Sequence, residues 1–294
     1  MKVGYVSLVG RPNVGKSTLM NALLNVKLAI TSDKVGTTRN IINGIYNDMD
    51  SQIIFVDTPG IHKPLNKLDA MLNRKSYSNT EGVDILLFLV DATKEFGKGD
   101  QFVLNQIKDE NIPVFLILNK IDKLKHDQLI AIIDSMKEIY PFAEIIPVSA
   151  FKGKNLEELK KVLKSYLPDG ERIFDEESLT NVSSRFIASE VVREKLLMLT
   201  HSEIPHAITC YTESFKEKKD LICIQVLVVV ERENLKKIVI GKKGALLKEV
   251  GVLAREDLEK FFGKKVFLET YVKTIKNWRD SEKNLIELGL GEDE

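Results

Sequence analysis

The sequence predicts two folded domains in 294 residues, the first α/β and the second α+β. In the first, short β-branched runs alternate with amphipathic helical stretches. Continuous apolar strands separated by helices are typical of a mainly parallel sheet with helices on both faces. In the second, a helix precedes two strands, a helix–glycine–helix segment and a further strand. Between the two, a proline and a glycine interrupt the helical pattern at 167–170.

The elements of the first domain follow from these periodicities. We expect strands at 3–9, 53–57, 83–90, 113–118 and 144–148, and helices that begin near Ser17, Leu65, Gly99, His126 and Asn155. The run 41–47 precedes 53–57 across a polar turn, which predicts one antiparallel hairpin within the parallel sheet.

The elements of the second domain follow in the order α-β-β-α-α-β. We expect them at 185–200, 206–215, 221–231, 235–262 for the two helices joined by glycine, and 266–274, with a short helix from about 277. The predicted divisions of the chain are a first domain at 1–167, a linker at 168–183, a second domain at 184–276, and a C-terminal helix with an acidic tail at 277–294.

Composition excludes several classes but names no partner. Forty-three Lys and Arg balance 43 Asp and Glu, and 44% hydrophobic residues are enough to build a core, which excludes a disordered chain. Two cysteines are too few for a disulfide framework. The apolar runs are shorter than a membrane span, and no signal peptide is evident. We therefore expect a soluble, cytoplasmic protein, and a monomer.

Residues 10–17 read G-R-P-N-V-G-K-S and match G-x-x-x-x-G-K-[ST] between a strand and a helix. In this context the glycines let backbone N–H groups point at phosphate oxygens. Lys16 supplies a cation to the β and γ phosphates, and Ser17 supplies a hydroxyl to Mg²⁺. The predicted phosphate contacts are Gly10, Asn13, Val14, Gly15, Lys16 and Ser17.

A strand that ends in an aspartate is expected to reach the same metal ion. The run I-I-F-V-D-T-P-G at 53–60 supplies Asp57 as this ligand. The backbone N–H of Gly60 can then approach the γ-phosphate, because glycine has no side chain to obstruct it.

Residues 119–122 read N-K-I-D and follow an apolar strand, so they lie where open α/β sheets bind ligands. Asp122 can accept hydrogen bonds from the N1–H and the exocyclic amine of guanine, which adenine cannot offer in that arrangement. Asn119 joins the loops and Lys120 lies along the base. A backbone N–H of the segment Ser149-Ala150 can donate to guanine O6. The pattern predicts GTP and GDP rather than ATP.

Residues 31–39 form a polar stretch of the kind that is ordered by a γ-phosphate and Mg²⁺. We select Thr38 as the second hydroxyl ligand of Mg²⁺, with Thr37 as the alternative. The first domain now resembles Ras-like GTPases of the TrmE-Era-EngA group. The segments that carry this resemblance are G-R-P-N-V-G-K-S-T, G-T-T-R, D-T-P-G, N-K-x-D and S-A, at 10–18, 36–39, 57–60, 119–122 and 149–150. The resemblance implies a P-loop GTPase domain and adds Thr18 to the nucleotide site.

The residue after D-x-x-G is Ile61, where other GTPases place a glutamine that orients water. An aliphatic side chain cannot polarise water, so we expect slow intrinsic hydrolysis. The resemblance implies that Asn13 helps to hold a K⁺ that supplies positive charge and stimulates turnover. Arg39 and Arg11 are alternative sources of charge, although we expect both to be solvated.

Residues 241–244 read G-K-K-G, a match that carries little weight alone, since about one G-x-x-G is expected by chance. Within its α-β-β-α-α-β order it resembles a type II KH domain, whose loop clamps about four single-stranded nucleotides. Residues 232–279 hold 13 Lys and Arg against 6 Asp and Glu, which suits a phosphate backbone. The predicted RNA contacts are Ile240, Gly241, Lys242, Lys243, Gly244 and Lys248.

One P-loop domain followed by one KH-like domain is the order of the Era family. The resemblance implies the 3′ region of small-subunit ribosomal RNA as partner and a role in assembly of the ribosomal small subunit. One alternative is a structural RNA-binding assembly factor that retains its nucleotide with little turnover. Another is a peripheral membrane signalling GTPase, but without a lipidation motif we expect membrane association to be weak at most. Trp278 either stacks on a base or anchors packing.

Overall fold

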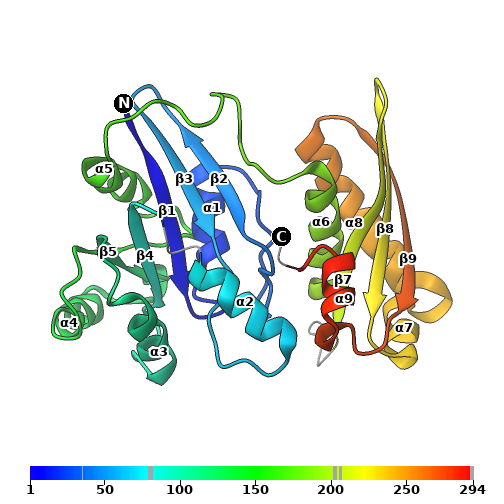
Figure 1. Cartoon of the computed structure of the whole chain (residues 1–294), viewed down its shortest axis with the longest axis horizontal. Coiled ribbons are helices and arrows are strands. Elements are labelled where there is room, and N and C mark those ends of the chain that lie inside the picture. Colours follow the sequence, from blue (N-terminus) through cyan, green and yellow to red (C-terminus); the bar gives the residue numbers. More distant parts are fainter. Residues whose placement is uncertain (35, 79–81, 201–203, 205–206, 292–294) are drawn as a thin grey trace. The chain divides into compact units, whose positions relative to one another are not determined.

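The computed structural model describes residues 1–34, 36–78, 82–200, 204 and 207–291. The chain forms two compact units. The first comprises Met1–Ala29, Gly36–Pro64 and Asp69–Asn181, and the second comprises Ile30–Val35, Leu65–Leu68 and Val182–Glu294. Each unit has its own sheet (Figure 1). The described helices include none that combines the length and the apolar character needed to cross a bilayer.

The sheet of the first unit has the strand order β2-β3-β1-β4-β5-β6. Its strands are β1 Lys2–Gly10, β2 Ile42–Asn47, β3 Ser51–Asp57, β4 Ile85–Asp91, β5 Val114–Asn119 and β6 Glu144–Pro147. All neighbours are parallel except β2 and β3, which form the expected hairpin. Strands β3, β4 and β5 are buried at every position, because helices cover both faces.

The helices of this unit are α1 Lys16–Leu24, α2 Lys67–Ser78, α3 Lys98–Ile107, α4 His126–Lys137 and α5 Leu156–Tyr166. Phe88 of β4 and Leu116 of β5 share a core with residues of α3 and α4. Alternate strand residues face the other side, where the ring of Tyr166 in α5 lies 4.9 Å from the ring of Phe115. The predicted α/β architecture is confirmed.

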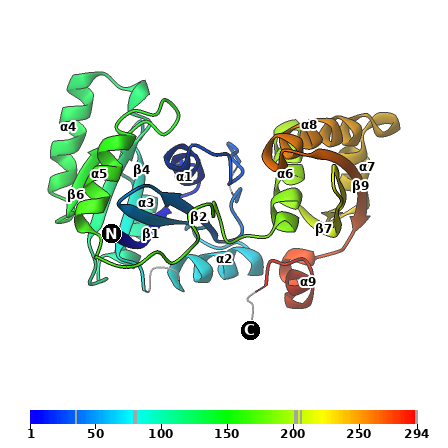
Figure 2. The same ribbon diagram turned by 90° about the horizontal axis from the view of Figure 1, so that it is seen from above.

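The second unit contains α6 Ser184–Leu199, β7 Ile208–Glu217, β8 Leu221–Val230, α7 Glu233–Ile240, α8 Ala245–Phe262, β9 Lys265–Thr274 and α9 Glu282–Glu287. The sheet order is β7-β8-β9, antiparallel and then parallel, and α6, α7 and α8 share one core with it (Figure 2). The expected α-β-β-α-α-β order is confirmed. His206, the expected start of β7, and the acidic tail at 292–294 lie outside the described residues. Trp278 is fully buried and donates a hydrogen bond to the Ala207 carbonyl oxygen (3.3 Å), so it anchors packing.

Residues 168–181, which make up most of the predicted linker, group with the first unit. The buried side chain of Gln52 in β3 holds this segment at its centre. Its Oε1 accepts hydrogen bonds from the N–H groups of Ile173 (2.7 Å) and Phe174 (3.0 Å), and its Nε2 donates to the Phe174 carbonyl oxygen (2.8 Å). We therefore propose that the first domain extends to Asn181.

The turn of the β2–β3 hairpin is tied to α5 by Lys164. Its ammonium group pairs with Asp48 and with Asp50 Oδ1 (2.8 Å). Burial alone would raise the pKa of Asp48, but hydrogen bonds from Lys164 and Ser51 hold it well below its usual range. The ionised carboxylate therefore stabilises the folded state.

We predict that Lys164→Met lowers the free energy of unfolding by about 1–2 kcal/mol at pH 7. Because the folded-state pKa of Asp48 is depressed, its contribution is fully present above the unfolded pKa of about 3.9. It shrinks as pH falls below that value and is lost only as pH falls through the folded-state pKa. Urea denaturation at pH 7 and pH 3 should show the difference between wild type and variant shrinking at pH 3. Lys137→Met, which breaks an exposed pair with Asp134 in α4, is the matched control and should change stability little. A difference as large at pH 3 as at pH 7 would contradict the ion-pair explanation.

Candidate functional site

The loop between β1 and α1 is shaped by positive φ angles at Gly10 (155°), Asn13 (64°) and Gly15 (103°). A Cβ atom on Gly15 would collide with Nδ2 of Asn119, so only glycine fits there. Gly15 is also the N-cap of α1, and among the described residues no side chain caps this helix and no acidic group occupies its first turn. The first N–H groups of α1 are therefore left for an anion such as a phosphate.

Lys16, the first residue of α1, carries the cation of this loop. Its Nζ donates hydrogen bonds to the carbonyl oxygens of Gly10 and Arg11, both at 3.1 Å. Burial lowers the pKa of Lys16 to about 8, although the charge of Asp57 opposes the shift. A phosphate here would offer this buried ammonium group a full counter-charge. Thr18 follows on the first turn of α1 and is partly exposed.

Three oxygen-bearing side chains meet below the loop. Ser17 Oγ donates to Asp57 Oδ2 (2.6 Å) and lies 2.9 Å from Thr38 Oγ1, which is 3.5 Å from the same carboxylate oxygen. Burial raises the pKa of Asp57 to about 6, opposed by Lys16 and the two hydroxyls. Its Oδ1 is buried, with no hydrogen-bond partner in the described part of the chain. A buried carboxylate with a spare oxygen and two hydroxyls is a donor set that suits Mg²⁺. The position of Thr38 supports Thr38, and not Thr37, as the second hydroxyl ligand of Mg²⁺.

Asn119, the last residue of β5, joins three loops. Its Nδ2 donates to the carbonyl oxygen of Val14 (2.8 Å), and its Oδ1 accepts from the N–H groups of Lys120 (2.8 Å) and Ala150 (3.0 Å). The Ala150 N–H, one of the groups considered for guanine O6, is thus engaged in this structure. The side chain ties the P-loop, the N-K-I-D loop and the Ser149-Ala150 loop together.

Asp122 is oriented by a second hydrogen bond, from Ser149 Oγ to its Oδ1 (2.5 Å). This bond is the largest cause that lowers the pKa of Asp122. An ionised carboxylate accepts hydrogen bonds only, as recognition of the guanine N1–H and amine requires.

Asp91 belongs to the site but was not predicted. It ends β4 in register with Asn119, and its Oδ2 pairs with Lys120 Nζ (2.7 Å), which also donates to the Asn13 carbonyl oxygen (2.8 Å). Burial alone would raise the pKa of Asp91, but hydrogen bonds from Lys120 and Thr93 lower it. The sequence feature that could have identified Asp91 is a second strand that ends in an aspartate, beside the strand that precedes N-K-I-D.

The D-T-P-G segment packs directly on the P-loop. A Cβ atom on Gly60 would lie 2.8 Å from the backbone N and Cα of Pro12, so glycine is required by this close approach. Ile61 is 1% exposed and belongs to the core that contains Phe88. Its side chain therefore packs in the core. The glutamine that other GTPases have at this position would instead be expected to face water.

The expectation that Arg39 is solvated is wrong, because it is only 4% exposed. Arg11 is exposed but not free, since its Nη1 pairs with Asp100 Oδ2 (3.1 Å) in α3. That carboxylate also accepts from the N–H of Gly97 and is itself buried. Arg11 is thus held against α3. Neither the burial of Arg39 nor the ion pair of Arg11 can be predicted from sequence periodicity.

The G-K-K-G loop lies between α7 and α8. Gly241 has φ 76° and Gly244 has φ 79°, and Lys243 shares this left-handed region with φ 52°. A Cβ atom on Gly241 would lie 2.8 Å from Cβ of Leu246, whereas one on Gly244 would meet no described atom within 4 Å. The second glycine is thus open to an approaching ligand backbone. Ile240 ends α7 and is half-buried.

A groove of about 370 Å³ begins at this loop and runs between α8 and β9. We call it the α8–β9 groove. Its lining is Gly244, Leu247, Lys248, Gly251, Val252, Arg255, Val266, Phe267, Leu268 and Thr270. Of the predicted RNA contacts it contains Gly244 and Lys248, and it adds Arg255, seven residues further along α8. The i, i+7 spacing of two cations on a helix was the signal that could have found it.

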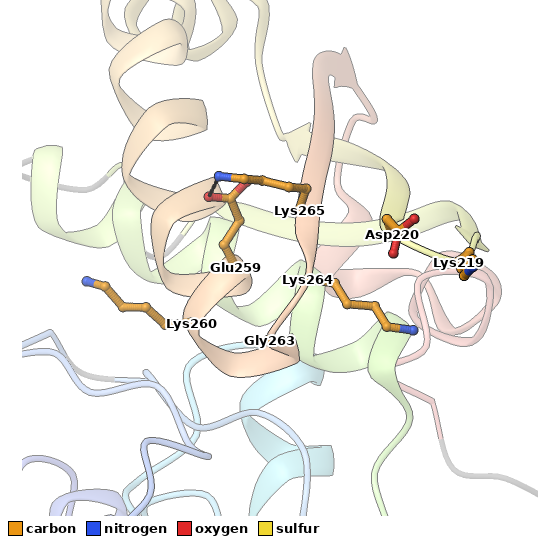
Figure 3. Close-up of a pocket in the computed structure, with 7 residues that line it drawn as sticks. All are labelled: Lys219, Asp220, Glu259, Lys260, Gly263, Lys264 and Lys265. Atoms are coloured by element: carbon orange, nitrogen blue, oxygen red, sulfur yellow. Dashed lines mark ion pairs between the residues drawn. The ribbon is translucent and has the colours of Figure 1, made fainter.

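A second hollow, of about 700 Å³, lies at the other end of α8 and is lined by Lys219, Asp220, Glu259, Lys260, Gly263, Lys264 and Lys265. Lys265 reaches Glu259 (3.8 Å), while Lys260 and Lys264 point away from each other (Figure 3). Lys264 pairs with Glu217 at 2.6 Å.

The cations of the α8–β9 groove and of the G-K-K-G loop differ from those of the second hollow in their ion pairing. Within the described ranges, no ion pair within 4.0 Å is formed by Lys242, Lys243, Lys248 or Arg255. Unpaired cations attract phosphates more strongly than cations that are already neutralised. The groove is therefore the better candidate for a nucleic-acid interface.

The fold and the two sites define a P-loop GTPase domain followed by a KH domain. Residues 5–120 match the family described as 50S ribosome-binding GTPase, and residues 203–279 match the KH domain. The chain is 46% identical to GTPase Era of Clostridium kluyveri (strain ATCC 8527) over 290 residues, which cover 98% of this chain and 99% of that protein. The chain belongs to the GTPase Era family.

Two solved structures agree over 99% of this chain and 100% of theirs, each with a TM-score of 0.96 and 42% identity. One is an Era variant of Aquifex aeolicus bound to GDP·AlF4⁻. The other is Era in complex with MgGDPNP and nucleotides 1506–1542 of 16S ribosomal RNA.

Asn119→Ala and Asp122→Ala separate the structural and recognition roles in the base site. We predict that Asn119→Ala lowers the free energy of unfolding by about 2–3 kcal/mol, because buried partners are deprived of their hydrogen bonds. Asp122→Ala should leave stability nearly unchanged. Both should weaken binding of a fluorescent GDP by roughly 100-fold or more. Urea denaturation without nucleotide and GDP titration measure the two effects. Equal stability losses would contradict this division of roles.

Proposed function

We propose that this protein is a GTP-binding and GTP-hydrolysing switch coupled to single-stranded RNA binding, which acts on the 3′ region of small-subunit ribosomal RNA during assembly of that subunit. The main support is that one Era-family chain contains both the cluster of Ser17, Thr38 and Asp57 and a G-x-x-G groove whose cations form no ion pair with any described residue. A relative with 42% identity binds MgGDPNP and a 16S ribosomal RNA segment. We expect the protein to act in the cytoplasm, beside this partner.

Nucleotide binding follows from the geometry of the first unit. The P-loop backbone would hold the phosphates, and Lys16 would exchange the carbonyl oxygens of Gly10 and Arg11 for the β and γ phosphates. Ser17, Thr38 and Asp57 would hold Mg²⁺, which neutralises charge on the phosphate oxygens. Asp122, oriented by Ser149, would select guanine. The same contacts without the γ-phosphate serve GDP.

The residue after D-x-x-G cannot orient water for hydrolysis, because Ile61 is aliphatic and lies in the core. Slow intrinsic turnover follows, which suits a timing switch. Asn13 stands in the P-loop with φ 64° and an exposed side chain, where it would help to hold a K⁺ that adds positive charge near the transferred phosphate. Binding or release of the γ-phosphate would reorder residues 36–39 and thereby alter RNA binding.

We predict that single-turnover GTP hydrolysis is faster in K⁺ than in Na⁺ by roughly tenfold or more, about 1.4 kcal/mol of barrier. Asn13→Asp should abolish the difference between the two salts. Equal wild-type rates in both salts would remove the K⁺ role and leave the GTPase assignment intact. No turnover in either salt, with or without RNA, would favour the alternative of a structural RNA-binding factor that only retains its nucleotide.

We propose that RNA binds at the G-K-K-G loop and the α8–β9 groove. The loop backbone is accessible at Gly244, and Lys242 and Lys243 present cations beside it. Phosphate contacts of this kind give affinity that depends on salt and little on sequence. The apolar residues of the groove are suited to the faces of unpaired bases.

We predict that Lys242→Ala combined with Lys243→Gly reduces the salt dependence of RNA affinity by about 0.7 log units per log unit of salt for each phosphate that the variant no longer neutralises. Glycine is used at 243 because its positive φ disfavours alanine. Lys264→Ala combined with Lys265→Ala, at the ion-paired hollow, is the control and should have a smaller effect. Titration of a single-stranded RNA at several salt concentrations measures this. Binding to anionic vesicles but not to RNA at matched salt would favour the membrane alternative.

A further inference from the structure

Residues 11–13 form the outer arc of the P-loop, and groups outside the loop hold each of the three. Pro12 lies against Gly60 of the D-T-P-G segment. The carbonyl oxygen of Asn13 accepts a hydrogen bond from Lys120 Nζ (2.8 Å). The third residue of the arc is held by its side chain, through an ion pair with a helix that has no other role in the predicted nucleotide site.

This ion pair joins Arg11 Nη1 to Asp100 Oδ2 (3.1 Å) in the first turn of α3. The same carboxylate oxygen accepts the N–H of Gly97 (3.1 Å), so the N-terminus of the helix fixes its position. The side chain of Asp100 is 4% exposed, and that of Arg11 is 44% exposed. Loss of the arginine would leave a buried carboxylate without its counter-charge, which makes this pair stronger than one between two exposed groups.

Gly99 makes room for the Arg11 side chain on α3. A Cβ atom on Gly99 would lie 2.6 Å from Nε, 2.9 Å from Cζ and 3.0 Å from Cδ of Arg11. Glycine is a poor helix former, and the φ angle of Gly99 does not lie in the left-handed region that favours glycine. The backbone of α3 therefore does not require glycine here. The absence of a side chain instead lets the guanidinium group reach Asp100.

The arc that Arg11 anchors also bears on the chemistry of the loop. The carbonyl oxygen of Arg11 accepts a hydrogen bond from Lys16 Nζ (3.1 Å). Asn13 has φ 64°, a conformation that residues other than glycine keep only where their surroundings impose it. Backbone N–H groups of a P-loop point at phosphate oxygens, on which charge develops during hydrolysis. A small displacement of these groups therefore costs more in the transition state than in the ground state.

We propose that Asp100 is a positioning residue for GTP hydrolysis, which holds the outer arc of the P-loop in its reactive arrangement through the ion pair with Arg11. Arg11 then acts on the loop and does not bring its own charge to the phosphates. This inference rests on the proposed function, and it adds the first turn of α3 to the parts of the chain that control the rate.

The test uses the full chain with three substitutions that break the ion pair in different ways. Asp100→Asn removes the negative charge and keeps an oxygen that can accept a hydrogen bond. Arg11→Gln removes the positive charge. Gly99→Ala keeps both charges and places a methyl group where the guanidinium group lies. The matched control is Arg172→Gln, which breaks an exposed pair with Glu176 (2.7 Å) in the same unit.

Single-turnover GTP hydrolysis is measured together with GDP affinity, and each rate is normalised to the fraction of chains that bind GDP. A loss of folded protein alone then leaves the rate unchanged. We expect each of the three variants to lower the rate by roughly tenfold or more and GDP affinity by less than about threefold. The combination of Asp100→Asn with Arg11→Gln should be no slower than the slower single variant, because both remove the same ion pair. Arg172→Gln should keep the wild-type rate.

The urea midpoint of Gly99→Ala should stay close to that of wild type, because the better helix propensity of alanine offsets the lost ion pair. A wild-type rate in Asp100→Asn or in Gly99→Ala would overturn the inference. A rate for Arg11→Gln far below the other two would also overturn it, since Arg11 would then act on the phosphates directly. GDP affinity that falls as much as the rate would reduce the arc to a binding element. Absence of hydrolysis by wild type would overturn the proposed function, and the inference with it.

Discussion

The nucleotide site depends on the side chain of Asn119, which connects the loops that form it. Parallel strands bring the ends of β1, β5 and β6 to one edge of the sheet, and the loops that follow these strands lie beyond the regular ladder. One buried amide group bonds to all three loops, at Val14, Lys120 and Ala150. The bond from Lys120 to Asp91 and to the Asn13 carbonyl oxygen adds a second connection. The phosphate and base regions are therefore held in one arrangement.

The charged groups inside this frame are incomplete without ligands. Among the described residues, the buried Lys16 ammonium group donates hydrogen bonds to carbonyl oxygens, and the buried Asp57 carboxylate has one oxygen without a hydrogen-bond partner. Burial disfavours both charges, as their shifted pKa values show. A nucleotide and its metal ion would supply the opposite charges. Binding would thus offset the free energy that the fold loses by burying these groups.

The KH unit uses glycine in three physically different ways. Gly241 is required by the close approach of Leu246, and Gly244 supplies a left-handed turn with open space beside it. Gly251 has neither a positive φ nor a close neighbour, and it weakens the helix that contains it. Only the first two roles follow from the G-x-x-G pattern. Gly251 lies outside that pattern, in the part of α8 that borders the α8–β9 groove.

The sequence by itself determined the order of the elements, the P-loop, the base-recognition loops and the G-K-K-G loop, because these depend on periodicity and on residues close together along the chain. It did not show that Gln52 holds residues 168–181 against the first unit, or that Arg39 is buried. Nor did it show that Asp91 pairs with Lys120 or that Arg255 lines the groove. Each of these is a contact between residues distant in sequence, and such contacts are decided by how the sheets and helices pack. Only the tertiary structure could therefore establish them.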